Sequence, residues 1–254
     1  MYKKRKVVIF LPFLYLSPST QQFNPYITSG NEEYWMNLIA DAMEPYLRAS
    51  GINFRRNDPD TSAAAAIRES NAGTYDFHLA LHSNAAGDAN SGNIRGIDVY
   101  FYPTSQDGLA MANILVDNLR TIYPLPDRVR AISTTAIGEV RRTNAPSVLI
   151  ELGYHDNVED ATWVENNVEE IARSIVLSVT EYFGLPFVTP QAVQTGTVTA
   201  AGGLNFRSYP TASSASYLLI PQGASVDVYG LENGWYTIGY NGLLGFGAAQ
   251  YISV

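Results

Sequence analysis

The chain has 254 residues, of which 46% are hydrophobic and 16% are charged, so it can bury a normal core and is not a disordered protein. Its net charge of −8 argues against a general nucleic-acid binder and against binding to an anionic membrane surface. The absence of cysteine excludes disulfides and thiolate metal sites. A transition-metal site must therefore use Asp, Glu or the three histidines, which are His78, His82 and His155.

The N-terminal segment allows two interpretations. Residues 1–6 are mostly basic and residues 7–16 are apolar, as at the start of a secretory signal. The same apolar run can be a buried first strand, either whole or only from Phe13 to Leu16, and no typical cleavage site follows it. We expect the strand and keep the leader as the alternative. No apolar run reaches the roughly 18 to 20 residues that span a bilayer, so membrane insertion is not predicted.

Strands and helices alternate up to about residue 186. A polar loop over residues 17–31 precedes a helix predicted from Glu32 to Ser50, which begins with two acids and is closed by Gly51. Further strands are predicted at 52–56, 75–82, 97–102 and 147–154, helices at 63–71, 107–122 and 158–182, and a loop or edge segment at 124–133. This order predicts an α/β domain over residues 1–186, a mostly parallel sheet with helices on both faces.

The pattern changes after a linker predicted at residues 187–196. Residues 197–254 contain short strands separated by turn signals, among them Asn233-Gly234 and Asn241-Gly242. We expect a small β-barrel or sandwich there.

Three polar residues are predicted at one edge of the larger sheet. Glu151 ends a buried apolar run, where a carboxylate must either pair with a cation or face an active site. His82 also ends a strand, and Glu33 begins the first helix. Strand C-termini and helix N-termini meet at one edge of a parallel sheet, so these side chains can converge. Two ligand-type residues and a second carboxylate suit metal-assisted hydrolysis, although each alone is also explained as a core or helix-capping residue.

Two segments carry a family resemblance. Residues 81–85 (LHSNA) and 142–160 (RTNAPSVLIELGYHDNVED) resemble the zinc-dependent N-acetylmuramoyl-L-alanine amidases of the Amidase_3 type, over roughly residues 13–185. The resemblance implies that His82 and Glu33, rather than Glu32, bind zinc and that Glu151 is the catalytic acid/base. It also implies peptidoglycan as the substrate. Asn84 and Arg142 are candidate substrate contacts.

The chain departs from the family pattern at one zinc ligand. The family has a further histidine in the loop after the first strand, where this chain has Thr20 and no nearby histidine. Two ligands are too few for a catalytic zinc site, so the third ligand stays unidentified. The candidates are the amides of Gln21, Gln22 and Asn24, and the imidazole of His155. A protein that binds the cell wall without cutting it is therefore the alternative function.

The C-terminal region resembles bacterial Src-homology-3-like (SH3-like) modules at residues 204–210, 220–223, 234–236, 245–246 and 251–252. Such a module implies binding to cell-wall peptide or glycan, although Trp235 and Tyr236 are also explained as core aromatics. The resemblance places the protein outside the cell or at the cell wall, reached by secretion as an autolysin or by release as a phage-type endolysin. Nucleic acid and protein partners are not predicted.

Overall fold

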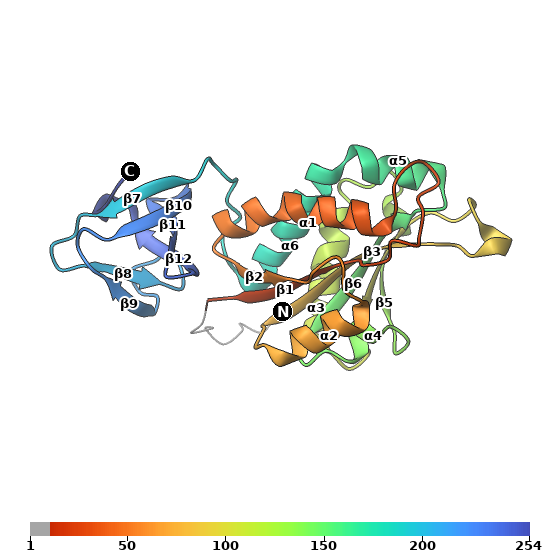
Figure 1. Cartoon of the computed structure of the whole chain (residues 1–254), viewed down its shortest axis with the longest axis horizontal. Coiled ribbons are helices and arrows are strands. Elements are labelled where there is room, and N and C mark those ends of the chain that lie inside the picture. The colour runs from red at the N-terminus through yellow and green to blue at the C-terminus, as the bar shows by residue number, and fades with distance from the viewer. Residues whose placement is uncertain (1–10) are drawn as a thin grey trace. The chain divides into compact units, whose positions relative to one another are not determined.

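A computed structural model describes residues 11–254 (Figure 1). These residues form two compact units. Of the described residues, the first unit consists of 13–44 and 54–182, and the second combines 11–12 and 45–53 with 183–254. The predicted boundaries at residues 186 and 197 stay a prediction, since residues 45–53 group with the C-terminal unit.

The α/β fold predicted for the N-terminal part is confirmed. Its six-stranded sheet has the order β2-β1-β3-β6-β4-β5. The strands are β1 (Phe13–Pro18), β2 (Asn53–Arg56), β3 (Phe77–Asn84), β4 (Ile97–Phe101), β5 (Val129–Ser133) and β6 (Ser147–Tyr154). The pairs β1–β3, β3–β6 and β4–β5 are parallel, while β4 runs antiparallel to β6. β3 and β6 lie at the centre and are buried along almost their whole length, as expected for apolar strands covered on both faces.

Helices cover both faces of this sheet. In Figure 1, α1 (Glu32–Ala49), α5 (Val158–Asn166) and α6 (Val168–Phe183) lie along one face, and α2 (Ala63–Ala72) and α4 (Gly138–Arg141) along the other. The remaining helix, α3 (Gln106–Leu119), contacts α6 through a hydrogen bond from Asn118 Nδ2 to Ser178 Oγ (3.0 Å).

The sequence predicted a single long helix at residues 158–182. This prediction is wrong in one respect, because the two helices α5 and α6 meet at Asn167. This residue leaves the helical conformation (φ −128°, ψ 23°), and its side-chain amide donates to the carbonyl of Trp163 (2.7 Å). A short amide side chain that bonds to nearby backbone competes with the helical hydrogen bonds, which explains the break.

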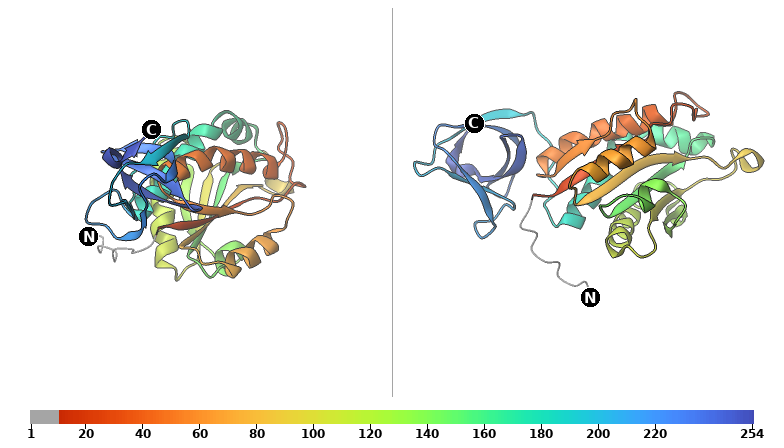
Figure 2. Two further views of the ribbon diagram at one scale, coloured as in Figure 1. Left: turned by 60° about the vertical axis from the view of Figure 1, so that its left-hand side comes forward. Right: turned by 60° about the horizontal axis from the view of Figure 1, so that its bottom comes forward.

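The C-terminal β module has a seven-stranded antiparallel sheet of order β13-β7-β10-β11-β12-β8-β9, which curls round on itself (Figure 2). The strands are β7 (Gln194–Val198), β8 (Leu204–Arg207), β9 (Ser216–Ile220), β10 (Ser225–Glu232), β11 (Trp235–Tyr240), β12 (Leu243–Ala248) and β13 (Ile252–Ser253). Both predicted Asn-Gly hairpins are confirmed, since Asn233 and Asn241 have positive φ and are each followed by a glycine with positive φ. The core contains Phe206, Val228 and Ile238.

The end of α1 and the start of β2 belong to the second unit. Asn53 forms two hydrogen bonds with the backbone of Leu244, accepting from its N–H (2.8 Å) and donating to its carbonyl (3.3 Å). Thr237 Oγ1 donates to the carbonyl of Ala49 (2.6 Å). Within residues 11–254, no helix is both long enough and apolar enough to cross a membrane.

Candidate functional site

Glu151 stands on the central strand β6, directly between two neighbouring strands. It pairs in register with His82 of β3 on one side and with Asp98 of β4 on the other. Its Oε2 atom is buried and has no hydrogen-bond partner among residues 11–254. A buried carboxylate oxygen without a partner is costly, and such atoms concentrate where a substrate or ion is bound.

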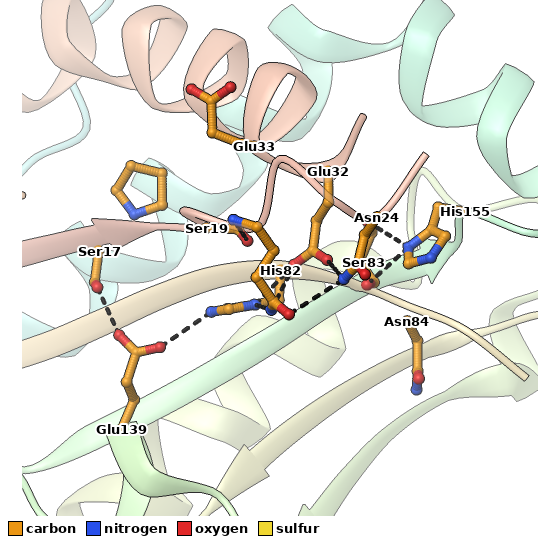
Figure 3. Close-up of polar contacts among 12 residues, drawn as sticks. Ser17, Ser19, Asn24, Glu32, Glu33, His82, Ser83, Asn84, Glu139 and His155 are labelled. Atoms are coloured by element: carbon orange, nitrogen blue, oxygen red, sulfur yellow. Dashed lines mark hydrogen bonds and ion pairs between the residues drawn. The ribbon is translucent and has the colours of Figure 1, made fainter. Parts of the chain in front are cut away.

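His82 lies between two carboxylates that contact opposite edges of its ring (Figure 3). Its Nδ1 is 2.8 Å from Glu32 Oε1, and its Nε2 is 3.0 Å from Glu139 Oε2. All three side chains are buried. The start of α1 lies beside the end of β3 because of the parallel topology, as the sequence predicted.

From the sequence, Glu33 was expected to lie beside His82. Glu32 occupies that position, whereas Glu33 points away along α1 (Figure 3) and its Oε1 accepts from Asn37 (3.2 Å). Successive helical residues are about 100° apart around the axis, so only one of two neighbours can face the sheet. The backbone N–H of Glu32 also donates to the carbonyl of Asn24 (2.9 Å), which fixes the start of the helix.

Glu139 is a site residue that the sequence analysis missed. It lies on the four-residue helix α4, which is too short to give a periodic signal in the sequence. Its Oε1 accepts from Ser17 Oγ (2.6 Å) and is 3.2 Å from Nε2 of His78, while its Oε2 contacts His82. His78 and His82 share one side of β3, as the alternation predicted, and a single carboxylate bridges both rings.

The opposite charges of Glu32, Glu139 and His82 stabilise one another, whereas burial has the largest influence on Glu151. Burial raises the pKa of Glu139 and Glu32, but contacts with the histidines outweigh it and hold both pKa values below the ordinary range. Burial also opposes the charge on His82, yet hydrogen bonds with Glu139 and Glu32 raise its pKa well above the usual value. For Glu151, burial dominates and raises the pKa to about 7. Perturbed carboxylates of this kind concentrate in active sites.

The amide side chains of the loop after β1 reach this cluster. Gln21 Nε2 lies 3.2 Å from His82 Nδ1 and 3.4 Å from Glu32 Oε1. Asn24 Nδ2 donates to Glu32 Oε2 (2.6 Å) and to Gln21 Oε1 (3.2 Å). His155 lies elsewhere, since its Nδ1 contacts the Oγ and carbonyl of Ser83 (3.1 Å each). Within residues 11–254, no group of three or more His, Cys, Asp or Glu side chains is arranged to hold a metal ion.

The two candidate substrate contacts lie at different places. Asn84 ends β3, and its Oδ1 accepts from the N–H of Ala85 (2.8 Å), a local turn contact. Arg142 follows α4 with an exposed side chain, and its carbonyl accepts from Asn71 Nδ2 (2.7 Å). Neither side chain belongs to the cluster around His82.

Two family profiles match the chain. Residues 24–181 match the Amidase_3 family, described as N-acetylmuramoyl-L-alanine amidase, and residues 202–253 match the bacterial SH3 domain. The N-acetylmuramoyl-L-alanine amidase LytC of Bacillus subtilis is 28% identical over 165 residues, which are 62% of this chain and 32% of that protein. The amidase CwlM of Bacillus licheniformis is 24% identical over 146 residues, or 56% of this chain and 54% of that protein. The chain therefore aligns with between a third and about half of the length of these two relatives.

The solved structures show the same fold. The N-acetylmuramoyl-L-alanine amidase from Clostridium difficile 630 superposes with a TM-score of 0.60 at 20% identity, covering 68% of this chain and 97% of that one. At this identity, the similarity establishes only the fold of the α/β part. The chemistry has to be inferred from the site residues.

Proposed function

The chain belongs to the N-acetylmuramoyl-L-alanine amidase family, and from that membership we propose that it hydrolyses the amide bond between N-acetylmuramic acid and L-alanine in peptidoglycan. The observation that carries this proposal is the half-buried Glu151 carboxylate at the centre of the sheet beside His82, whose buried Oε2 is left without a partner. The substrate is a component of the cell wall, so the protein acts at the cell wall or outside the cell.

Glu151 is proposed as the acid/base. A carboxyl group with a pKa of about 7 exists in both protonation states near neutral pH. It can therefore take a proton from the attacking water and deliver it to the leaving amine of L-alanine, which is the requirement for one residue to serve both steps. Burial is the cause of the raised pKa, so the same packing that isolates Glu151 prepares it for proton transfer.

The family is generally zinc-dependent, and Glu32 and His82 are the two residues of the polar cluster proposed to bind the ion. Glu32 Oε1 and His82 Nδ1 lie 2.8 Å apart, and Glu139 contacts the opposite nitrogen of the same ring. Histidines that bind metals almost always donate their second N–H to a carboxylate or carbonyl, which fixes the ring and its tautomer. Glu32 and His82 would hold the ion, which would supply Lewis-acid polarisation of the scissile carbonyl.

Glu139 is proposed as the positioning residue of this site. Its contact with His82 Nε2 keeps that ring oriented with Nδ1 toward Glu32, and its contacts with Ser17 and His78 fix the carboxylate itself. Asn84 and Arg142 remain proposed substrate contacts, and the exposed guanidinium of Arg142 can pair with a carboxylate of the stem peptide.

The test is release of dye from labelled peptidoglycan, together with the appearance of new amino termini, by the wild type and by Glu151→Gln. We expect the wild type to release both and the variant to lose at least a hundredfold in rate, since general acid–base catalysis contributes about 10² to 10⁴. Glu33→Gln is the matched control and should keep the wild-type rate. Equal rates for Glu151→Gln and wild type would contradict the role of Glu151.

A second candidate function is wall binding, supported by a pocket in the C-terminal unit. The pocket has a volume of about 380 Å³. Its lining includes Arg48, Asp227, Tyr229 and Tyr240. Aromatic rings beside charged groups suit a peptide or glycan ligand. Sedimentation with purified walls, measured on Glu151→Gln, separates binding from cleavage. Wall binding by the variant without hydrolysis by the wild type would favour a pure binding protein.

A further inference from the structure

The third ligand of the proposed cation site has no acidic or histidine candidate. On the Nδ1 side of the His82 ring, the neighbouring polar atoms are Glu32 Oε1 and Gln21 Nε2. Glu139 contacts the opposite nitrogen, and His155 is bonded to Ser83. A catalytic zinc site needs three protein ligands and one open position. The missing donor must therefore be a neutral side chain.

We propose that the side-chain amide of Gln21 is the third ligand, completing the cation site with Glu32 and His82. This inference rests on the proposed function, since the ion serves that reaction. Gln21 Nε2, His82 Nδ1 and Glu32 Oε1 form a triangle with sides of 2.8, 3.2 and 3.4 Å. Ligand atoms about 2.0 Å from a tetrahedrally bound zinc ion are about 3.3 Å apart, so the triangle has the dimensions of three ligands.

The amide group of Gln21 can present either of its polar atoms to this point. In the structure the nitrogen faces His82, and the oxygen accepts a hydrogen bond from Asn24 (3.2 Å). A half-turn about the last side-chain bond exchanges the two atoms. It gives up the hydrogen bond from Asn24 and the contacts of Nε2 with Glu32 and His82. Oxygen and nitrogen of an amide occupy nearly the same positions, so the carbonyl oxygen then completes the triangle without movement of the backbone.

The loop that carries Gln21 is fixed by two hydrogen bonds to its surroundings and by one within the loop. The N–H of Ser19 donates to the carbonyl of Leu81 (2.9 Å), which ties the loop to the end of β3 one residue from His82. Ser19 Oγ accepts from the N–H of Gln21 (3.2 Å), and its carbonyl accepts from Asn37 of α1 (3.1 Å). The loop is thus bonded to the two elements that carry His82 and Glu32, as a ligand-bearing loop must be.

The neighbouring amides are placed differently. Asn24 donates to the other oxygen of Glu32, so its amide orients that carboxylate. Gln22 is exposed, which makes it the matched control on the same loop. A neutral amide oxygen binds zinc more weakly than imidazole, so this site should hold zinc less tightly than one with a second histidine.

The experiment measures zinc affinity of the metal-stripped full chain by competition with a chromophoric chelator, together with the absorption spectrum of bound Co²⁺. Gln21→Leu should weaken zinc binding at least tenfold, Gln21→His should strengthen it at least tenfold, and Gln22→Leu should leave it unchanged. The Co²⁺ spectrum should change in both Gln21 variants only. Circular dichroism melting checks that each variant is folded.

Three results would overturn the assignment. The first is that Gln21→Leu binds zinc as tightly as Gln22→Leu does, while Glu32→Gln no longer binds zinc. This result would mean that the ion binds at the site without Gln21. The second is no gain in affinity for Gln21→His. The third is absence of zinc binding by the wild type. Peptidoglycan hydrolysis is measured separately, so a failure of this assignment is distinguishable from a failure of the proposed activity.

Discussion

Glu151 and His82 are direct partners in the parallel pairing of β6 with β3, so their side chains start from neighbouring points at the same edge of the sheet. Asp98 flanks Glu151 on the other strand and is bonded to Arg130 (2.7 Å). Asp98 is therefore already paired with Arg130. Burial has the largest influence on the pKa of Glu151. This arrangement has consequences that can be measured without substrate.

The stability of the metal-stripped protein should depend on pH through Glu151. Its pKa rises from an ordinary 4.5 to about 7 on folding, so the folded state binds more protons than the unfolded state between these values. Stability from this group is therefore present below about pH 4.5 and is lost as pH rises through 7. Relative to Glu151→Gln, the wild type should lose about 2 kcal/mol between pH 5 and pH 8. Urea unfolding of both proteins at both pH values measures this difference.

Because both proteins carry the same other titratable groups, the difference between them reports the effect of the Glu151 carboxyl. A difference in unfolding free energy between wild type and Glu151→Gln that stays constant from pH 5 to pH 8 would contradict the raised pKa.

The sequence predicted the edge of the sheet at which the site lies, but only some of the residues that form the site. His82 and Glu151 were predictable because strand alternation and the order of strands and helices place both at strand ends in a parallel sheet. The choice between Glu32 and Glu33 depends on the angle at which α1 begins, which is set by the hydrogen bond of Glu32 to the loop at Asn24. Adjacent positions in a sequence carry no information on that angle.

Glu139 could not be predicted for a different reason. Its contacts to Ser17, His78 and His82 join residues 57 to 122 positions apart in the chain, and only tertiary packing creates them. The break between α5 and α6 was missed because the hydrophobic pattern continues across Asn167. By contrast, the two Asn-Gly hairpins of the β module were predictable, since they are determined by local backbone preferences.

Glu32 and Glu33 offer a comparison of adjacent identical side chains. Glu32→Gln removes the carboxylate beside His82, so it should reduce peptidoglycan hydrolysis at least tenfold, while Glu33→Gln should stay within about twofold of the wild type. Rates of dye release from the same wall preparation measure both. A larger loss for Glu33→Gln than for Glu32→Gln would restore the original assignment of Glu33 and reject that of Glu32.

Glu139 should matter for stability more than any exposed ion pair. Glu139→Gln removes a buried charge that contacts both His78 and His82, and breaking such a pair typically costs about 3 to 5 kcal/mol. Arg55→Gln breaks the exposed ion pair with Glu69 and should cost less than about 1 kcal/mol. Urea unfolding at pH 7 compares the two. Equal losses would mean that the bridging of the histidines contributes little.

Wall binding by the C-terminal unit should depend on Tyr229. This tyrosine lines the 380 Å³ pocket together with Asp227 and Tyr240, and a side chain on Gly239 would meet its ring, so the ring is held in place by close packing. In a Glu151→Gln background, which prevents cleavage during the assay, Tyr229→Ala should weaken binding to purified walls about fivefold to tenfold, the loss expected for an aromatic contact worth about 1 kcal/mol. Sedimentation with increasing amounts of wall measures the change.

The matched control is Tyr251→Ala in the same background, because Tyr251 is an exposed tyrosine of the same unit that does not line the pocket. It should bind walls as the parent does. Tyr229→Phe adds a finer comparison, since it keeps the ring and removes only the hydroxyl that hydrogen bonds with Asp227. If stacking provides the affinity, the Phe variant binds normally. If Tyr229→Ala and Tyr251→Ala weaken binding equally while melting unchanged, the pocket is not the wall-binding surface.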